Sequence, residues 1–313
     1  MKTQQLCWVA AALLACLGCG SSDDDSDSDS NDKDKTEQES DNMTDSENEE
    51  ETDTGAADSA EEDTGTRIEI TVTCGADDCI DPTWISISGG SFEMGSEDGG
   101  ADETPVHTVT ISDFEMMKTE VTLAQYADCV IAGDCTVPDS GNPIEDVWED
   151  LSKGNYPING VTWSEAVSFC EWIGGRLPSE AEWEFAARSG GQDNRYPWGD
   201  GDASCDNTVM IDDANIEGCG TIFVFDVCSK TEGNTESGLC DMAGNVWEWV
   251  QDTYQMSYED APVDGSAWEE DGTAERVMRG GSYRDDAASQ RTTVRSYLFY
   301  NASFENLGFR CVR

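Results

Sequence analysis

An acidic run near the amino terminus limits how much of this chain can fold. From Asp23 to Asp63 there are 20 acidic residues, opposed only by Lys33 and Lys35. Residues 20–66 are almost all Ser, Asp, Glu, Thr, Asn and Gly, which bury too little apolar surface to offset chain entropy. Like charges also repel and extend such a segment. We therefore expect a disordered acidic tether over residues 20–66, with calcium buffering by the run as the alternative.

The first 19 residues have the pattern of a secretory signal peptide. Lys2 precedes an apolar run from Leu6 to Leu17, which small residues and a cysteine follow. The run is too short to span a bilayer, which takes about 20 apolar residues. We expect the mature protein to be exported.

The end of this leader resembles a bacterial lipobox, in which a cysteine sulfur carries diacylglycerol. The sequence reads LLACLGC over residues 13–19. Cys16 fits the lipobox better, whereas Cys19 leaves an even number of cysteines for pairing. The prediction is a lipoprotein of the bacterial cell envelope, held to the outer membrane by its acyl chains on the periplasmic or surface face. An ordinary cleaved signal with incidental cysteines is the alternative.

The negative net charge of the chain argues against nucleic acid as a partner. The formal net charge is −50, and the chain beyond residue 66 is still acidic. Nucleic acid requires basic patches, so we expect no nucleic-acid binding. Residues 67–313 are enough for one sizeable core and contain no repeat of 20–50 residues, so a single domain is predicted there.

The 13 cysteines favour disulfides in an exported chain. Cys7 leaves with the leader, and lipidation of Cys19 would leave ten cysteines for five bridges. Two local bridges are plausible because turn-forming residues separate the partners, and these are Cys74 with Cys79 and Cys129 with Cys135. The pairing of Cys205, Cys219, Cys228 and Cys240 stays open. Zinc is excluded because residues 67–313 contain no Cys-x-x-Cys pair and only one histidine, His107.

Local signals place three helices. Capping residues at Thr122, Thr162 and Ser179 predict helices over 123–132, 163–173 and 180–188, ended by glycines 133, 174 and 190. In the second helix a buried stripe is expected at Trp163, Ala166, Val167 and Cys170. Short strands are expected within 84–92, 107–114 and 276–278. Among long polar loops, these elements predict an α+β domain stapled by disulfides. Six tryptophans are expected in the core: Trp163, Trp172, Trp183, Trp198, Trp247 and Trp249.

Seven segments, in order, resemble the sulfatase-modifying factor (formylglycine-generating enzyme) family. They are SGGSFEMGS at 88–96, ETPVHTVTISDFEMMKTEVT at 103–122, NGVTWSEAVSFCEWIGGRLPSEAEWEFAAR at 159–188, YPWG at 196–199, GLCDMAGNVWEWVQD at 238–252, RVMRGGSY at 276–283 and NLGFRC at 306–311. The resemblance implies the formylglycine-generating-enzyme fold, which is related to C-type lectin-like domains and has little regular secondary structure.

The resemblance also implies roles for particular residues. Cys170 and Cys311 match a structural disulfide, and Ser282 and Asn306 match residues that line the substrate pocket. Calcium is implied at the side chains of Asp241 and Glu248 with the carbonyls of Gly244 and Val246. A second calcium site would use Asn207 and the Thr208 carbonyl. The alternative is that Asp241 and Glu248 only pair locally, and that Ser282 serves only the backbone of its turn.

The family's copper ligands are missing. Its oxidases hold copper with a Cys-x4-Cys pair soon after the GGSY-like motif, where this chain reads RDDAASQRTTVR over 284–295. Copper(I) needs thiolates, so no copper and no formylglycine-generating oxidase activity are expected. A branch of iron-dependent sulfoxide synthases needs several histidines, so no iron is expected with His107 alone. We expect a non-catalytic module that binds a protein, peptide or glycan. Altered chemistry in the same pocket is the alternative, followed by a true oxidase.

Overall fold

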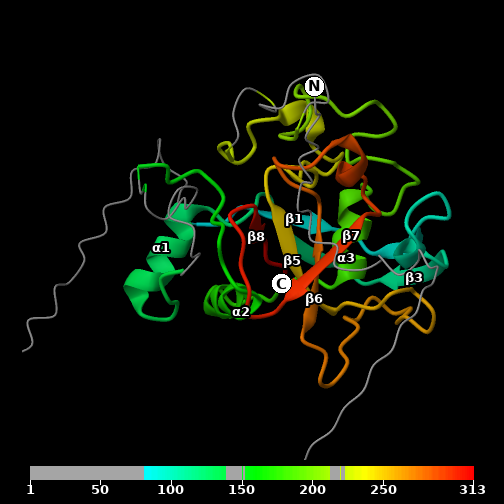
Figure 1. Ribbon diagram of the computed structural model, residues 1–313, viewed down its shortest axis with the longest axis horizontal. Coiled ribbons are helices and arrows are strands. Elements are labelled where there is room, and N and C mark those ends of the chain that lie inside the picture. Colours follow the sequence, from blue (N-terminus) through cyan, green and yellow to red (C-terminus); the bar gives the residue numbers. More distant parts are fainter. Residues whose placement is uncertain (1–80, 139–149, 151, 212–218, 220–222) are drawn as a thin grey trace, which may run out of the picture. The chain divides into compact units, whose positions relative to one another are not determined.

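The computed structural model describes residues 81–138, 150, 152–211, 219 and 223–313, all within a compact unit spanning Gly65–Arg313 (Figure 1). The leader with Cys16 and Cys19, the acidic tether and the Cys74–Cys79 pair lie outside the described residues. Within those residues, no helix has the length and apolar character needed to cross a bilayer.

The described part of the chain contains three α-helices, and each begins where its capping residue predicts. They are α1 (Leu123–Ala132), α2 (Trp163–Trp172) and α3 (Glu180–Ala187). Each has a complete capping box, because the side chains of the cap and of the third helical residue exchange hydrogen bonds with backbone N–H groups. α1 ends at Gly133, whose left-handed φ of 87° suits glycine.

The strands are short and form three antiparallel or mixed sheets. β1 (Trp84–Ile87) pairs with β4 (Phe114–Met117), and β2 (Gly90–Met94) pairs with β3 (His107–Ile111). The largest sheet has the order β7-β6-β5-β8, formed by Arg295–Phe299, Glu275–Arg279, Trp247–Thr253 and Leu307–Phe309. β8 runs parallel to β5, so the end of the chain adds the last strand. Short 3-10 helices lie at Ala101–Glu103, Thr231–Gly233 and Ala287–Gln290. The fold is therefore α+β with few helices, as predicted.

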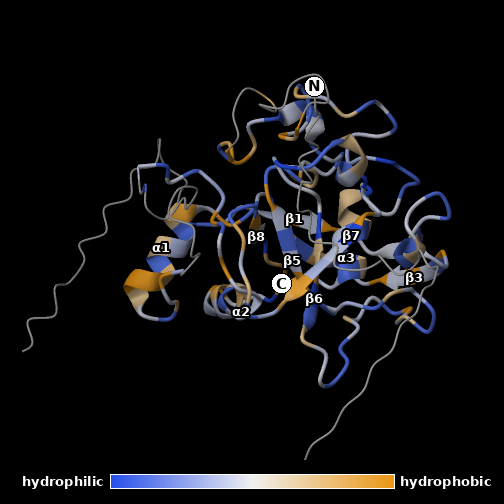
Figure 2. Ribbon diagram, in the orientation of Figure 1, coloured by the Kyte–Doolittle hydropathy of each residue, from blue (hydrophilic) through white to orange (hydrophobic). Residues whose placement is uncertain are grey.

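Apolar side chains from helices and strands fill the interior. In Figure 2 apolar residues colour parts of α1 and of the strands, while most loops are hydrophilic. Trp183 and Trp249 are fully buried, and Trp247 is nearly so. The expectation for Trp172 was wrong, since 37% of it is exposed. Trp172 is the last residue of α2, where the helix leaves the core, and Phe169 takes the buried position instead.

Four disulfides lie among the described residues. Cys170 is joined to Cys311 and Cys129 to Cys135, the two pairings expected within these residues. The pairings that the sequence left open are Cys205 with Cys219 and Cys228 with Cys240. The bridge to Cys311 ties the carboxyl-terminal strand to α2.

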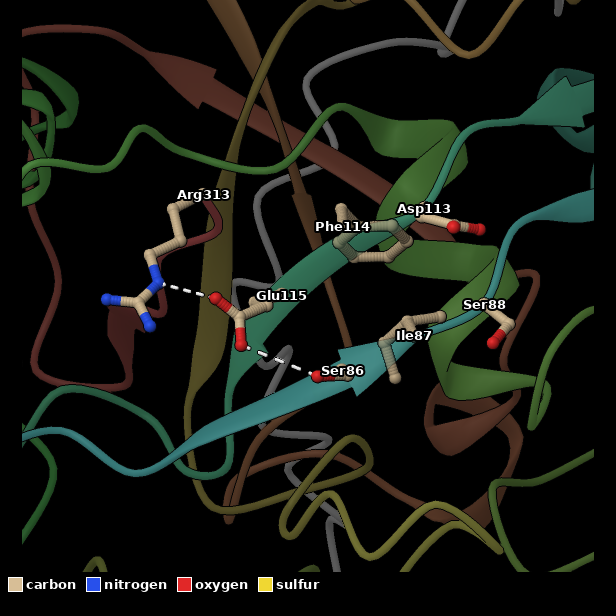
Figure 3. Close-up of a pocket in the computed structure, with 7 residues that line it drawn as sticks. All are labelled: Ser86, Ile87, Ser88, Asp113, Phe114, Glu115 and Arg313. Atoms are coloured by element: carbon tan, nitrogen blue, oxygen red, sulfur yellow. Dashed lines mark hydrogen bonds and ion pairs between the residues drawn. The ribbon is translucent and has the colours of Figure 1, made fainter.

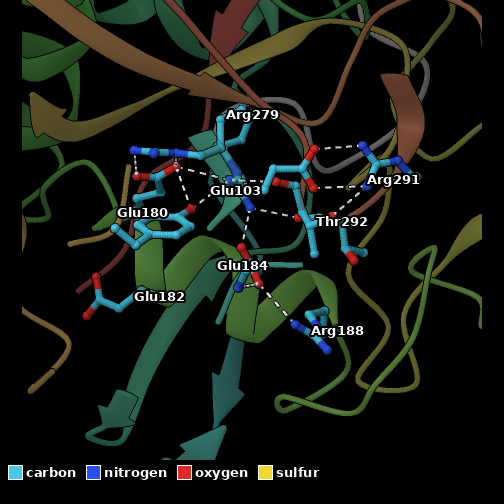
Figure 4. Close-up of polar contacts among 12 residues, drawn as sticks. Glu103, Glu180, Glu182, Glu184, Arg188, Arg279, Arg291 and Thr292 are labelled. Atoms are coloured by element: carbon cyan, nitrogen blue, oxygen red, sulfur yellow. Dashed lines mark hydrogen bonds and ion pairs between the residues drawn. The ribbon is translucent and has the colours of Figure 1, made fainter. Parts of the chain in front are cut away.

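A buried ion network fixes α3 against the large sheet (Figure 4). Arg279 of β6 lies 3.0 Å from the Glu180 carboxylate and 2.7 Å from that of Glu184. Arg295 of β7 binds Glu180 at 2.7 Å. Burial opposes ionisation of Glu180, but the two guanidinium groups outweigh it and hold its pKa below the usual range. The network orients α3 and the strands that carry the candidate site.

Candidate functional site

Ser282 and Asn306 are 24 residues apart in sequence and lie in contact. The Asn306 amide donates to Ser282 Oγ at 2.9 Å. Ser282 Oγ in turn donates to the carboxylate of Asp285 and accepts from the backbone N–H of Arg284 at 3.2 Å. Ser282 is fully buried, so its hydroxyl is held in one orientation. The two residues matched to the family's pocket thus belong to one hydrogen-bonded group.

Asp285 is the acidic member of this group, and sequence reasoning assigned it no role. Trp247 of β5 donates from Nε1 to Asp285 Oδ2 at 2.9 Å. Burial raises the pKa of Asp285, although its hydrogen bonds with Ser282 and Trp247 act in the opposite direction. His107 lies in β3 against Tyr258, with ring centroids 5.0 Å apart, and it makes no contact with Ser282 among the described residues. The arrangement is suited to hydrogen bonding rather than to histidine-assisted nucleophilic attack.

Gln290 is a buried side chain that contacts Ser282. Its Nε2 donates to the Ser282 carbonyl at 3.2 Å, and the side chain is fully buried. Its Oε1 has no hydrogen-bond partner among the described residues. Asp285 and Gln290 are separated by four residues, the spacing expected of the copper-binding cysteines. This chain therefore presents hard oxygen and amide groups at that spacing beside Ser282.

The loop implied for calcium carries Asp241 at one end and Glu248 at the other. Asp241 has a positive φ of 55° and accepts from the Cys228 N–H at 2.6 Å. A side chain at Gly244 would meet Thr208 Oγ1 at 2.2 Å, so the turn requires glycine. Glu248 accepts from Trp183 Nε1 at 2.9 Å.

Arg310 engages both oxygens of Glu248. Its Nε and Nη2 each lie 2.7 Å from a Glu248 oxygen, and both side chains are shielded from solvent. Arg310 also donates to the Cys240 carbonyl at 2.8 Å. Within the described residues no group of three or more His, Cys, Asp and Glu side chains is arranged to hold a metal ion. A calcium ion bound by all four predicted ligands would have to share a Glu248 oxygen with Arg310.

A third buried carboxylate, Glu120, faces the same loop. It accepts from Asn245 Nδ2 at 2.8 Å and from the Val246 N–H at 3.1 Å. Burial raises the pKa of Glu120 well above its usual range, and the charges of Asp241 and Glu248 raise it further. Asp241, Glu248 and Glu120 thus form a buried acidic cluster with Arg310 as its cationic partner. The donor atoms are all oxygens, the ligand type that calcium prefers, but the three carboxylates are not arranged as a metal site in this structure.

The second calcium site has less support in the local contacts. Asn207 Oδ1 accepts from the Ser204 N–H at 2.9 Å, and its Nδ2 donates to the Asp202 carbonyl at 3.2 Å. Both ends of the amide thus serve a local turn. Calcium at Asn207 and Thr208 stays a prediction.

Two surface pockets among the described residues lie away from Ser282 and Asn306. Figure 3 shows one, of about 370 Å³, between β1, β4 and the last residue of the chain. Glu115 reaches Arg313 there at 2.8 Å. The other lies beside α2 and is lined partly by Arg176 and Gln251. Neither pocket brings together the groups expected of a catalytic centre.

Residues 76–313 match the sulfatase-modifying factor enzyme 1-like domain. The chain is 34% identical to the formylglycine-generating enzyme of Streptomyces coelicolor, with 72% of this chain and 88% of that protein covered. It is 27% identical to the inactive C-alpha-formylglycine-generating enzyme 2 of Mus musculus, with 74% and 85% covered.

Two further comparisons concern length and fold. The chain is 32% identical to the serine/threonine-protein kinase Pkn1 of Chlamydia trachomatis, covering 73% of this chain but 38% of that protein. Among solved structures it is similar to PvdO from Pseudomonas aeruginosa, with a TM-score of 0.63, 26% identity, and 74% of this chain and 94% of that chain covered. The similarity therefore covers nearly the whole of some relatives and a minor part of others.

Proposed function

This chain belongs to the sulfatase-modifying factor enzyme 1-like family, and from that premise we propose that it is a non-oxidising binding module of a bacterial cell envelope. The ligand site is the half-buried pair Asp285 and Asn306, which the buried Ser282 and Gln290 hold in place. Its partner is a protein, peptide or glycan with hydrogen-bonding groups.

The observation that carries this proposal is the replacement of sulfur by oxygen and amide groups around Ser282. Asp285 and Gln290 touch the Ser282 hydroxyl and carbonyl respectively, and neither can serve as a thiolate ligand for copper(I). The similarity to a mouse relative described as inactive is in keeping with a family that includes non-oxidising members.

The test is an oxidase assay with copper, oxygen and a cysteine-containing sulfatase peptide, using the Streptomyces coelicolor relative as positive control. The wild-type chain should leave the peptide unchanged and retain no copper(I). A matched double variant, Asp285→Cys with Gln290→Cys, should gain copper(I) binding if only the ligands are missing. Conversion of the peptide to the aldehyde by the wild-type chain would overturn the proposal.

One observation favours a second candidate, an enzyme of altered chemistry at the same site. Burial raises the pKa of Asp285, which accepts a hydrogen bond from the Ser282 hydroxyl. A carboxyl group beside a buried hydroxyl is a plausible acid–base pair. Turnover of a bound ligand that Asp285→Asn abolishes while leaving binding intact would decide for the enzyme.

Calcium is part of the proposal as a structural ion. The residues that would hold it are Asp241 and Glu248 with the carbonyls of Gly244 and Val246, and Glu120 faces them. The ion would stabilise the ionised form of these carboxylates and reduce their mutual repulsion. This effect would stabilise the loop between the Cys228–Cys240 bridge and β5.

The cell-envelope location rests on the leader. We propose lipidation at Cys16 or Cys19, with the acidic residues 20–66 linking the anchor to the folded domain. Mass spectrometry of the mature amino terminus from membranes tests this, with diacylglycerol on one of the two cysteines expected. An unmodified amino terminus in the soluble fraction would contradict it.

A further inference from the structure

β7 is the outer strand of the large sheet, and its far edge has unpaired backbone groups among the described residues. Tyr300 N–H donates to the Ala274 carbonyl at 2.8 Å, in register with the β6–β7 pairing. Since hydrogen-bonded pairs alternate in an antiparallel ladder, Leu298 bonds to β6. The N–H and C=O groups of Tyr297 therefore point away from the sheet, and no described residue bonds to them.

Aromatic side chains gather beside this edge. Tyr297 and Phe299 lie on one face of β7, two residues apart, and are 41% and 53% exposed. Tyr254 stacks on Tyr297 with ring centroids 4.2 Å apart. Glu275 of β6 is directly opposite Phe299, so its carboxylate emerges on the same face. We call Tyr254, Glu275, Tyr297 and Phe299 the β7 surface. An edge strand with unpaired backbone groups and exposed aromatic side chains is a surface on which another chain can bind.

The charges around the β7 surface are negative. Tyr254 donates its hydroxyl to Asp102 at 2.9 Å, and Glu275 has no ion pair or side-chain hydrogen bond among the described residues. The exposed turn that leads into β6 adds Glu270 and Asp271. The neighbouring cations are already engaged: Arg295 is buried against Glu180, and Arg276 lies over the ring of Trp163, 4.0 Å from its centroid.

We propose that the β7 surface docks an extended, basic peptide segment of a partner protein. The segment adds to the sheet as a strand alongside β7 and pairs with the outward backbone groups of Tyr297. Its Arg or Lys side chains lie against Tyr297 and Phe299 and meet the Glu275 carboxylate. Aromatic faces attract cations, and carboxylates complement them, so a basic strand satisfies both features of the surface. The proposal goes beyond the function assigned above, because it uses neither the Ser282 group nor the calcium loop.

The test measures binding of a fluorescent 12-residue peptide of alternating arginine and valine to the full chain by anisotropy. The double variant Tyr297→Thr with Phe299→Thr keeps strand propensity and removes the aromatic rings. Its Kd should weaken at least about tenfold, the sum expected for two cation–π contacts. Because basic peptides also bind the acidic tether, Glu275→Gln is compared with Glu232→Gln, an exposed acid on a distant 3-10 helix. Both remove one charge, and only Glu275→Gln should weaken binding.

Backbone pairing has its own readout. Hydrogen exchange at the Tyr297 and Phe299 amides should slow when the peptide binds, and a peptide N-methylated at alternate residues should fail to bind to this edge. Equal effects of Glu275→Gln and Glu232→Gln, or unchanged affinity of the double variant, would overturn the proposal. So would protection of amides elsewhere but not in β7, or displacement of the peptide by a neutral oligosaccharide.

Discussion

Arg310 and Glu248 form a two-point ion pair closed off from solvent, with two N···O distances of 2.7 Å. Removing one partner leaves a buried charge uncompensated, which costs about 3–5 kcal/mol. Arg310→Met is therefore expected to lower the free energy of unfolding by that amount in urea titrations. The double variant with Glu248→Met should lose less than the two single variants added together. Strict additivity would mean that the pair does not act as a unit.

The two disulfides that involve α2 and α1 close loops of very different length. The Cys170–Cys311 bridge spans 141 residues and the Cys129–Cys135 bridge spans 6. In the chain-entropy model these contribute about 5 and about 2 kcal/mol respectively. Replacing Cys170 and Cys311 by alanine should thus lower the melting temperature more than the same change at Cys129 and Cys135. Equal losses in calorimetry would show that loop length is not the main factor.

Calcium should raise thermal stability through the carboxylate cluster. At a calcium concentration 100 times its Kd the gain is about 2.7 kcal/mol, or roughly 5–10 °C in Tm for a domain of this size. Asp241→Ala should abolish the response, whereas Asp271→Ala, at an exposed acid, should keep it. If chelation leaves the wild-type Tm unchanged and elemental analysis finds no calcium, the cluster holds no ion.

Asp252 should make stability depend on pH. Burial, and next the charge of Glu180, raises the pKa of Asp252 to about 7. Its oxygens accept from the Glu180 and Trp268 N–H groups, both at 2.7 Å. The folded state thus binds this proton more tightly than the unfolded state, so its contribution to stability falls as pH rises from about 4 to 7.

The loss is on the order of 4 kcal/mol at most, since one pKa unit is about 1.4 kcal/mol. Urea titrations between pH 5 and 8 should show the wild-type decline flattened in Asp252→Asn and retained in Asp271→Asn. If the free energy of unfolding of Asp252→Asn declines with the same slope, the pH dependence arises from other titratable groups.

The helices could be predicted because their signals are local. Thr122 and Gln125, three residues apart, contain the whole capping box of α1, and tertiary contacts are not needed to recognise it. The strand segment 84–92 was predicted without its break. A side chain at Gly89 would lie 2.2 Å from the Ile111 carbonyl, and this close approach separates β1 from β2. That contact joins residues distant in sequence, so no local pattern reports it.

Residues of the candidate site could be predicted from the sequence only where they match a family motif with a known role. Ser282 and Asn306 were identified in this way, but Asp285, Gln290 and Glu120 were not. Glu120 is placed at the site by its contact with Asn245, which lies 125 residues away in sequence, so no local pattern identifies it. Arg310 did leave a signal, since an arginine between the buried residues Phe309 and Cys311 must find an internal partner. The sequence alone could not name Glu248 as that partner.

The late position of the parallel strand β8 in the sequence affects how the domain folds during synthesis. A nascent chain that ends at Asn306 still lacks the strand beside β5, the thiol for Cys170 and the guanidinium for Glu248. Val312 then bridges Met116 and Arg176, joining segments made much earlier. Co-translational folding of this domain must therefore stall in an open state until residues 307–312 emerge. A chain terminated before Leu307 should therefore be degraded by proteases rather than accumulate as a folded, shortened protein.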